Sequence, residues 1–215
     1  MSPRPLYIFG AGGHGKVVAE AARGSLVYEP RAFIDDDPSR WGHAWDGLPV
    51  LGGRDLLASL EDEAEVALGI GDNARRAAAA DTIFAFNRKL ATIIHPTAVV
   101  AGGVELGLGT YVAPLAVLHS DARVGRGSIV NSAAVVEHDC RLGDWVHVSP
   151  GAALGGGVHV GEGAHVALGA IILPGLALGP WATLGAGAVM VHSLPDYATA
   201  MGVPARVKDP RRRHA

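Results

Sequence analysis

The segment Glu137-His138-Asp139 is the part of the sequence best suited to moving a proton. A carboxylate beside an imidazole stabilises the charged ring and fixes which ring nitrogen carries the proton, and a general base needs both. A solvated run of polar residues would look the same in isolation. The catalytic interpretation therefore depends on the element that carries His138.

The loop at residues 10–15 fits the pattern G-x-G-x-x-G and is a second candidate site. An apolar run at 6–9 precedes it and a helix-compatible stretch at 16–23 follows, so its N–H groups and the helix N-terminus suit a phosphate. Asp35 stands twenty residues after Gly15, where an acid commonly meets a ribose hydroxyl. A turn that only lets the helix pack against the strand remains the alternative.

Residues 1–90 have the pattern of a small α/β domain with a parallel sheet. Further strands are predicted at 65–71 and in a segment that ends at 33–36, and an alanine-rich helix is predicted at 73–87. A dinucleotide fold with two mononucleotide halves needs more chain than this, which disfavours an NAD-dependent oxidoreductase. One half is enough to bind one nucleotide.

From residue 94 onward the sequence repeats every six residues. Seventeen successive positions at this spacing carry an aliphatic residue or methionine: Ile94, Val100, Leu106, Val112, Leu118, Val124, Val130, Val136, Leu142, Val148, Leu154, Val160, Val166, Ile172, Leu178, Leu184 and Met190. The residue two places earlier is small at most of these positions. A helix would repeat near 3.6 residues and an isolated strand near 2, so neither explains the pattern.

A period of eighteen lies on top of this, because a Leu-Gly or Val-Gly pair recurs at 106–107, 124–125, 142–143, 160–161 and 178–179. Three hexads then make one coil with three flat faces, in which short parallel strands stack, aliphatic residues point inward and glycine turns corners. At about 4.8 Å per coil, the prism is on the order of 25 Å long. His138 falls outside the aliphatic column, whereas Cys140 takes a small inward position unsuited to a nucleophile.

Composition argues against several other classes of function. The net charge of −3 over 215 residues gives no electrostatic footprint for nucleic acid, and the basic run at 211–213 is expected to be a solvated tail. One cysteine allows no intrachain disulfide, and no His/Cys cluster has the spacing of a metal site. Residues 167–191 carry no charge, but glycine and proline interrupt them and they keep the six-residue period, so no membrane span is expected.

Five segments occur together and in order, at residues 10–15, 33–36, 136–140, 147–149 and 202–206. In this combination the chain resembles the hexapeptide-repeat acetyltransferases of bacterial surface-sugar pathways, a family that includes the bacillosamine, perosamine and sialic-acid enzymes. The resemblance implies a left-handed parallel β-helix, a homotrimer and a cytoplasmic enzyme. It also implies transfer of an acetyl group from acetyl-CoA to the 4-amino group of a nucleotide-linked 4-amino-4,6-dideoxyhexose, for surface-glycan or O-antigen biosynthesis.

By position, the resemblance assigns His138 as the catalytic base and Asp139 as the acid that raises its basicity. A glutamate takes this second place in the member that aligns most closely, so Glu137 stays open as an alternative partner. The nucleotide-linked sugar is assigned to Gly12, Gly13, His14, Asp35, Asp36 and Gly71. Acetyl-CoA is assigned to His147, Gly156, Leu168, Pro174 and Ala186.

The expected organisation is a nucleotide-sugar-binding α/β domain at 1–90, a β-helix at 91–192 and a C-terminal tail at 193–215. Two other functions remain open beside N-acetylation. One is O-acetylation of a sialic acid or another sugar, and the other is a non-catalytic trimer that binds a nucleotide sugar. The nucleobase and the stereochemistry of the sugar are not specified by the sequence.

Overall fold

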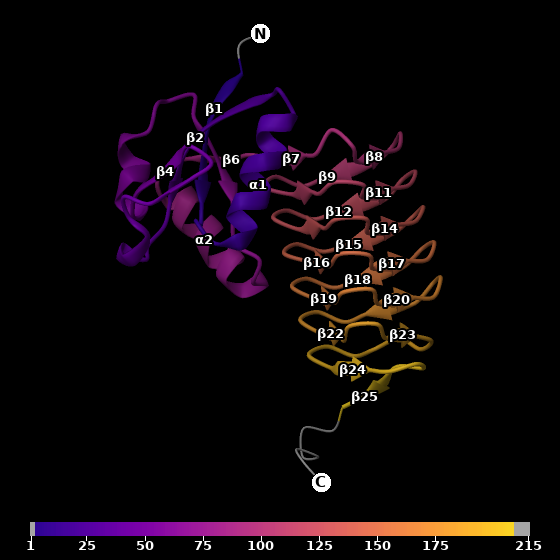
Figure 1. Ribbon diagram of the computed structural model, residues 1–215. Helices are drawn as coiled ribbons and strands as arrows, with labels where there is room; N and C mark the ends of the chain where they lie inside the picture. The colour runs from indigo at the N-terminus through magenta and orange to yellow at the C-terminus, as the bar shows by residue number, and fades with distance from the viewer. Residues whose placement is uncertain (1–2, 209–215) are drawn as a thin grey trace.

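The computed structural model describes residues 3–208 and consists of an N-terminal α/β domain beside a left-handed parallel β-helix (Figure 1). The N-terminal sheet contains, in spatial order, β3 (Ala44–Trp45), β4 (Leu48–Gly52), β2 (Tyr28–Ile34), β1 (Arg4–Phe9), β5 (Glu65–Leu68) and β6 (Lys89–Leu90). All of its pairs are parallel except β3 with β4. The parallel α/β unit expected from the sequence is confirmed, and the short β3–β4 hairpin is an addition that the pattern did not predict.

Helices α1 (Gly13–Gly24) and α2 (Asn73–Ala85) pack against opposite faces of this sheet. Successive residues of a strand point to opposite faces. Leu6 and Ile8 of β1 accordingly share a core with α1, while Tyr7 and Phe9 share one with α2. Two 3₁₀ turns, η1 (Pro38–Arg40) and η2 (Arg54–Ser59), complete the domain.

From β7 to β23 the β-helix is built from two-residue strands that stack at intervals of eighteen residues, and two further strands, β24 and β25, follow at its end. The first sheet, called the domain-facing sheet, contains β7 (Ile93–Ile94), β10 (Tyr111–Val112), β13 (Ile129–Val130), β16 (His147–Val148), β19 (His165–Val166), β22 (Thr183–Leu184), β24 (Thr199–Met201) and β25 (Arg206–Val207). The second, called the apolar sheet, contains β8 (Val99–Val100), β11 (Val117–Leu118), β14 (Val135–Val136), β17 (Ala153–Leu154), β20 (Ile171–Ile172) and β23 (Val189–Met190). The third, called the charged sheet, contains β9 (Glu105–Leu106), β12 (Arg123–Val124), β15 (Arg141–Leu142), β18 (His159–Val160) and β21 (Ala177–Leu178).

The column of aliphatic residues forms the core of the prism, as the period predicts. From Val112 onward its members are buried, but Ile94 and Val100 are each 38% exposed because no coil covers the first one. The small residues two places earlier also point inward, and where they are polar they bond to the corners: Ser128 Oγ donates to the Gly143 carbonyl at 3.0 Å. Cys140 is fully buried, and burial raises the pKa of its thiol, so it is a packing residue.

Parallel stacking continues beyond residue 192, into the segment expected as a tail. Leu194 forms a parallel bridge with Leu178, and β24 pairs in parallel with β22. β25 then pairs antiparallel with β24. Leu194 and Ala200 are buried in the same core, so this segment closes the lower end of the prism. The basic run at 211–213 lies outside the described residues.

The N-terminal domain lies against the upper coils of the domain-facing sheet. Residues of α1 share a core with the outward side chains Ile93, Tyr111 and Ile129 of three successive coils. Within residues 3–208, neither helix is long and apolar enough to span a bilayer.

Candidate active site

His138 lies at the corner that joins the apolar sheet to the charged sheet. Its Nδ1 donates a hydrogen bond to Asp139 Oδ2 at 2.8 Å, which leaves Nε2 free to accept a proton. This bond raises the pKa of His138, and the negative charges of Asp139 and Glu137 act in the same direction. The imidazole is 63% exposed, so a substrate can reach it.

The backbone explains why Asp139 and not Glu137 reaches the ring. Asp139 has a φ of 62°, the left-handed corner conformation that glycine takes at Gly157 and Gly175 in the next two coils, and aspartate tolerates it. Glu137 lies on the other side, with its carboxylate 3.7 Å from Nε2 of His119. The geometry therefore pairs His138 with Asp139.

Three of the predicted residues stack in this corner, which we call the His138 corner: His138, Gly156 and Pro174, at intervals of eighteen. The N–H of Gly157 donates to the His138 carbonyl at 2.9 Å, and that of Gly175 to the Gly156 carbonyl at 3.0 Å. A methyl group on Gly156 would lie 2.6 Å from Nε2 of His138. Gly156 thus leaves the space that the imidazole occupies.

Leu168 and Ala186 stack in the corner on the other side of the apolar sheet. The N–H of Gly187 donates to the Leu168 carbonyl at 2.8 Å, and the Leu168 side chain is 60% exposed. Four of the five positions predicted for acetyl-CoA, Gly156, Leu168, Pro174 and Ala186, therefore border the lower part of the apolar sheet.

His147 lies elsewhere, on the domain-facing sheet and against the N-terminal domain. Its ring is 6.5 Å from that of His14 and 5.1 Å from that of His165, and its Nε2 is 3.1 Å from Asn131 Nδ2. Burial, with the nearby His165 and Arg76, lowers the pKa of His147 to about 3. Within one chain the structure therefore does not bring His147 together with the other four acetyl-CoA positions.

The N-terminal domain contains a cavity of about 330 Å³ at the carboxyl ends of its central strands. Such a position suits a nucleotide in a parallel α/β sheet. Its lining includes Asp36, Arg54 and Arg75 beside the glycine loop. Burial opposes ionisation of Asp36, but hydrogen bonds from the side chain and backbone of Arg54 outweigh it and lower its pKa. Neither Arg54 nor Arg75 was predicted, because an isolated arginine near the start of a helix carries no recognisable spacing.

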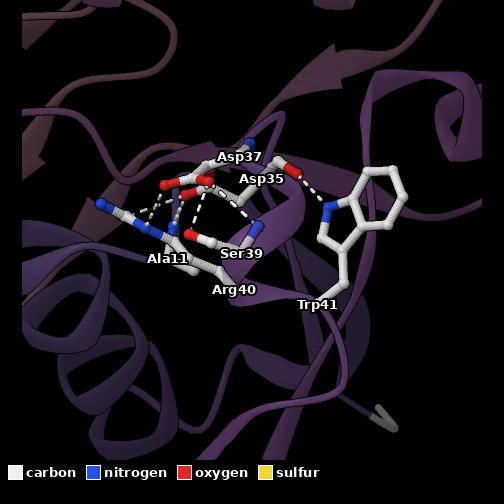
Figure 2. A network of polar contacts seen from close by, with 6 residues as sticks. All are labelled: Ala11, Asp35, Asp37, Ser39, Arg40 and Trp41. Carbon is white, nitrogen blue, oxygen red and sulfur yellow. Dashed lines mark hydrogen bonds and ion pairs between the residues drawn. The ribbon is translucent and has the colours of Figure 1, made fainter.

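Asp35 organises the loops around this cavity (Figure 2). Its Oδ2 accepts hydrogen bonds from the N–H of Ala11 at 2.7 Å and from Arg40 Nη1 at 3.0 Å, and its Oδ1 accepts one from the N–H of Asp37 at 2.9 Å. Trp41 Nε1 donates to its backbone carbonyl. Because protein donors already engage both oxygens, the carboxylate of Asp35 links the glycine loop to the segment after β2.

The glycines of the first loop divide into two kinds. A methyl group on Gly15 would lie 2.0 Å from the Gly10 carbonyl, so this glycine is needed for α1 to pack against β1. Gly13 has open space around its α-carbon, and Gly71 meets only His14, at 3.9 Å. Close packing therefore explains Gly15 but not Gly13 or Gly71, which leaves the latter two free to face a ligand.

His14 follows these glycines at the start of α1. Burial and the charge of Arg76 lower its pKa to about 4, so the ring is neutral at physiological pH. Among the residues that the structure describes, none makes a hydrogen bond with its buried Nε2. Within the same range, no group of three His, Cys, Asp or Glu side chains could hold a metal ion.

Comparisons with known proteins give the family. Residues 5–83 match the family model of the PglD N-terminal domain. A variant of perosamine N-acetyltransferase from Caulobacter crescentus, in complex with CoA and GDP-perosamine, is 39% identical with a TM-score of 0.91, covering 95% of this chain and 97% of that one. The acetyltransferase domain of PglB from Neisseria gonorrhoeae, in complex with acetyl coenzyme A, is 38% identical with a TM-score of 0.90, covering 96% and 100%.

WeeI from Acinetobacter baumannii is 28% identical with a TM-score of 0.88, covering 94% and 99%. No curated protein sequence matches the chain. The structural likeness extends over both domains, and the family expected from the five sequence segments is confirmed. The chain belongs to the hexapeptide-repeat sugar acetyltransferases, and it is an acyltransferase.

Proposed function

We propose that the protein transfers an acetyl group from acetyl-CoA to the 4-amino group of a nucleotide-linked 4-amino-4,6-dideoxyhexose. The observation that carries this proposal is the exposed His138–Asp139 pair on a β-helix corner, in a chain that also has a nucleotide-sized cavity. A relative that covers almost the whole chain binds CoA and GDP-perosamine together. We place the reaction in the cytoplasm, as a step of bacterial surface-glycan biosynthesis.

In the proposed mechanism Nε2 of His138 accepts the proton of the amine as the nitrogen attacks the thioester carbonyl. Asp139 stabilises the imidazolium that forms. Backbone N–H groups at the corners stabilise the tetrahedral oxyanion, and the imidazolium returns its proton to the departing thiolate. The amide N–C bond forms and the thioester C–S bond breaks, so no covalent acyl-enzyme is required.

The experiment that tests this function is an assay of CoA release with a panel of nucleotide-linked sugars. The panel contains UDP-, GDP- and dTDP-linked 4-amino-4,6-dideoxyhexoses, the matching 4-hydroxy sugars and a sialic acid, and mass spectrometry locates the acetyl group. Acetylation of the 4-amino sugars supports the proposal. Acetylation of only the hydroxyl acceptors would replace it by O-acetyl transfer, and no release with any member would contradict it.

We expect the active protein to be a homotrimer with each site between two chains. The outward residues of the apolar sheet are aliphatic in every coil: Val99, Val117, Val135, Ala153, Ile171 and Val189. The corresponding face of the charged sheet carries Glu105, Arg123, Arg141 and His159. An exposed aliphatic face of this kind favours contact with another copy of the chain.

That contact would bring the corner with Leu168 and Ala186 of one chain close to the His138 corner of another. Light scattering is expected to give three times the chain mass of 22.1 kDa. Ile171→Arg should dissociate the assembly and lower activity in proportion, whereas Arg141→Glu on the charged sheet should leave the mass unchanged. A fully active monomer would contradict the prediction.

The nucleotide is assigned to the cavity beside Asp36. Asp36→Ala is expected to raise the KM for the nucleotide sugar about tenfold, because it removes a carboxylate from the cavity lining together with the hydrogen bonds that hold Arg54 there, and to leave the KM for acetyl-CoA nearly unchanged. Asp35→Ala should act in the same direction by releasing the glycine loop. Steady-state kinetics with each substrate varied in turn measures both constants.

Asp37→Ala is the control, because Asp37 bonds to Ser39 and does not line the cavity. It should leave both constants within about a factor of two, as surface substitutions usually do. If Asp36→Ala raises the KM for acetyl-CoA as much as that for the sugar, the nucleotide does not bind in this cavity.

A further inference from the structure

One face of α2 is fixed to three successive coils of the β-helix by two polar side chains. Arg76 Nε donates to the Gly127 carbonyl at 2.5 Å, and Arg76 Nη2 donates to the Trp145 carbonyl at 2.9 Å. One turn earlier, Asn73 Nδ2 donates to the Gly163 carbonyl at 3.0 Å. Residues 127, 145 and 163 are eighteen apart, so the pair binds the same corner in three consecutive coils.

Other hydrogen bonds of Arg76 go to the loop that leads from β5 into α2 and to the first residue of α2. Its Nη1 donates to the carbonyls of Gly71 at 2.9 Å and Ile70 at 3.3 Å, and its Nη2 also donates to Asn73 Oδ1 at 2.9 Å. Ile70 lines the nucleotide cavity, and Gly71 is one of the positions assigned to the nucleotide-linked sugar. The guanidinium of Arg76 therefore joins the loop between β5 and α2, which contains Ile70 and Gly71, to the β-helix.

Burying the charged guanidinium of Arg76 costs free energy, which argues that this residue does more than fill space between the domains. Arg76 is 1% exposed, and no carboxylate hydrogen-bonds to it among the described residues. Burial lowers its pKa to about 10, which still leaves it charged at physiological pH. An aliphatic contact would join the domains without burying a cation. A planar guanidinium has fixed donor directions, so a small tilt of the N-terminal domain would break several of its hydrogen bonds to the β-helix together. It can therefore fix the orientation of that domain.

We propose that Arg76, together with Asn73, is a positioning residue that fixes the orientation of the nucleotide-binding domain on the β-helix, so that the bound sugar is aimed at the acetyl-transfer corner. This inference rests on the proposed function, because it assumes that the N-terminal domain holds one substrate and the β-helix the other. It differs from a role in binding, since Arg76 does not line the nucleotide cavity. Losing Arg76 should therefore affect transfer more than nucleotide affinity.

The chain offers a matched control in Arg88, whose guanidinium also binds backbone carbonyls, those of Leu57, Ala58, Leu60 and Glu61. All of these lie within the N-terminal domain, so Arg88→Gln removes the same chemistry without touching the β-helix. We expect Arg76→Gln to lower kcat by about 10- to 100-fold, the effect of misplacing reacting groups by roughly 1 Å. The Kd of the nucleotide sugar, measured by calorimetry, should change by less than about threefold. Arg88→Gln should lower the Tm and leave kcat and Kd nearly unchanged.

A second measurement does not depend on turnover. Cys140 is buried, so spin labels can be placed selectively at Glu63→Cys and His159→Cys, two exposed positions on the two domains. With labelled chains diluted by unlabelled ones, electron paramagnetic resonance gives the interdomain distance distribution. It should be narrow in the parent protein and in Arg88→Gln, and broad or shifted in Arg76→Gln. Arg76→Lys, which keeps the charge but not the fork of donors, should be intermediate and replaces Arg76→Gln if that variant does not fold.

An unchanged distance distribution in both Arg76 variants would overturn the inference, as would a kcat that stays near the parental value. Equal losses in Arg76→Gln and Arg88→Gln would also overturn it, because they would indicate general destabilisation. If the parent protein transfers acetyl groups to no nucleotide sugar, the proposed function fails and the distance measurement alone decides whether Arg76 orients the domain.

Discussion

His138→Ala is expected to lower kcat by about two to four orders of magnitude, the usual range for losing a general base. The side chain is 63% exposed and lies outside the aliphatic column, so its removal leaves no cavity in the prism. The Tm and the KM for acetyl-CoA should therefore change little. Rapid mixing of the enzyme with both substrates, with CoA release as the recorded signal, separates the chemical step from binding.

The carboxylate beside the ring should set the pH dependence. Asp139 raises the pKa of His138, and a base works only when it is deprotonated, so the rate should rise with pH through this raised pKa. Asp139→Asn removes the charge, which lowers the pKa of His138 and moves the rise in rate to lower pH. Turnover on the plateau should fall less than in His138→Ala. Glu137→Gln should have a smaller effect on both.

Two results would contradict this assignment. If Glu137→Gln shifts the pH profile more than Asp139→Asn does, Glu137 is the partner of His138 during catalysis. If His138→Ala keeps a near-normal kcat, the amine arrives already deprotonated and His138 is not the base.

Gly156→Ala is expected to lower kcat about 10- to 100-fold without unfolding the protein, because the added methyl group displaces the imidazole from its place. The methyl carbon would lie 2.6 Å from Nε2 and 2.7 Å from Cε1 of His138. The backbone of Gly156 is outside the left-handed region, so alanine introduces no conformational strain there. The neighbour that must move is an exposed side chain, so the Tm should fall little.

Gly102→Ala is the matched control. Gly102 occupies the same corner three coils earlier, and a methyl group there meets no atom within 4 Å. Its kcat should equal that of the parent. A Gly156→Ala variant with parental kcat and a raised KM for acetyl-CoA would contradict the steric argument and support the role of Gly156 in lining the co-substrate.

The six-residue period is enough to predict the β-helix between residues 94 and 190 and to tell which of its side chains point inward. Each coil repeats the same local pattern of inward aliphatic residues, small residues and corners. The structure of one coil therefore predicts that of the next, and no knowledge of distant contacts is needed. The same arithmetic stacks His138, Gly156 and Pro174 in one corner. His147 is nine residues, or half a coil, away from His138, so the same arithmetic places it on another side of the prism. The parallel sheet and both helices of the N-terminal domain followed from their periodicity and from the glycine loop.

The sequence does not specify which elements pack against each face or which polar side chains pair, and the folded chain shows both. It pairs Asp139 with His138 through a left-handed corner, a choice between two flanking carboxylates that composition leaves open. It shows Asp35 bonded to backbone N–H groups of its own domain at the edge of the cavity that it helps to line, and its contact with substrate stays a prediction. It buries Arg76 against carbonyls 51 and 69 residues away. These contacts escape prediction because a repeat specifies only the spacing within a coil, whereas the packing of one domain on another depends on long-range contacts that have no local period.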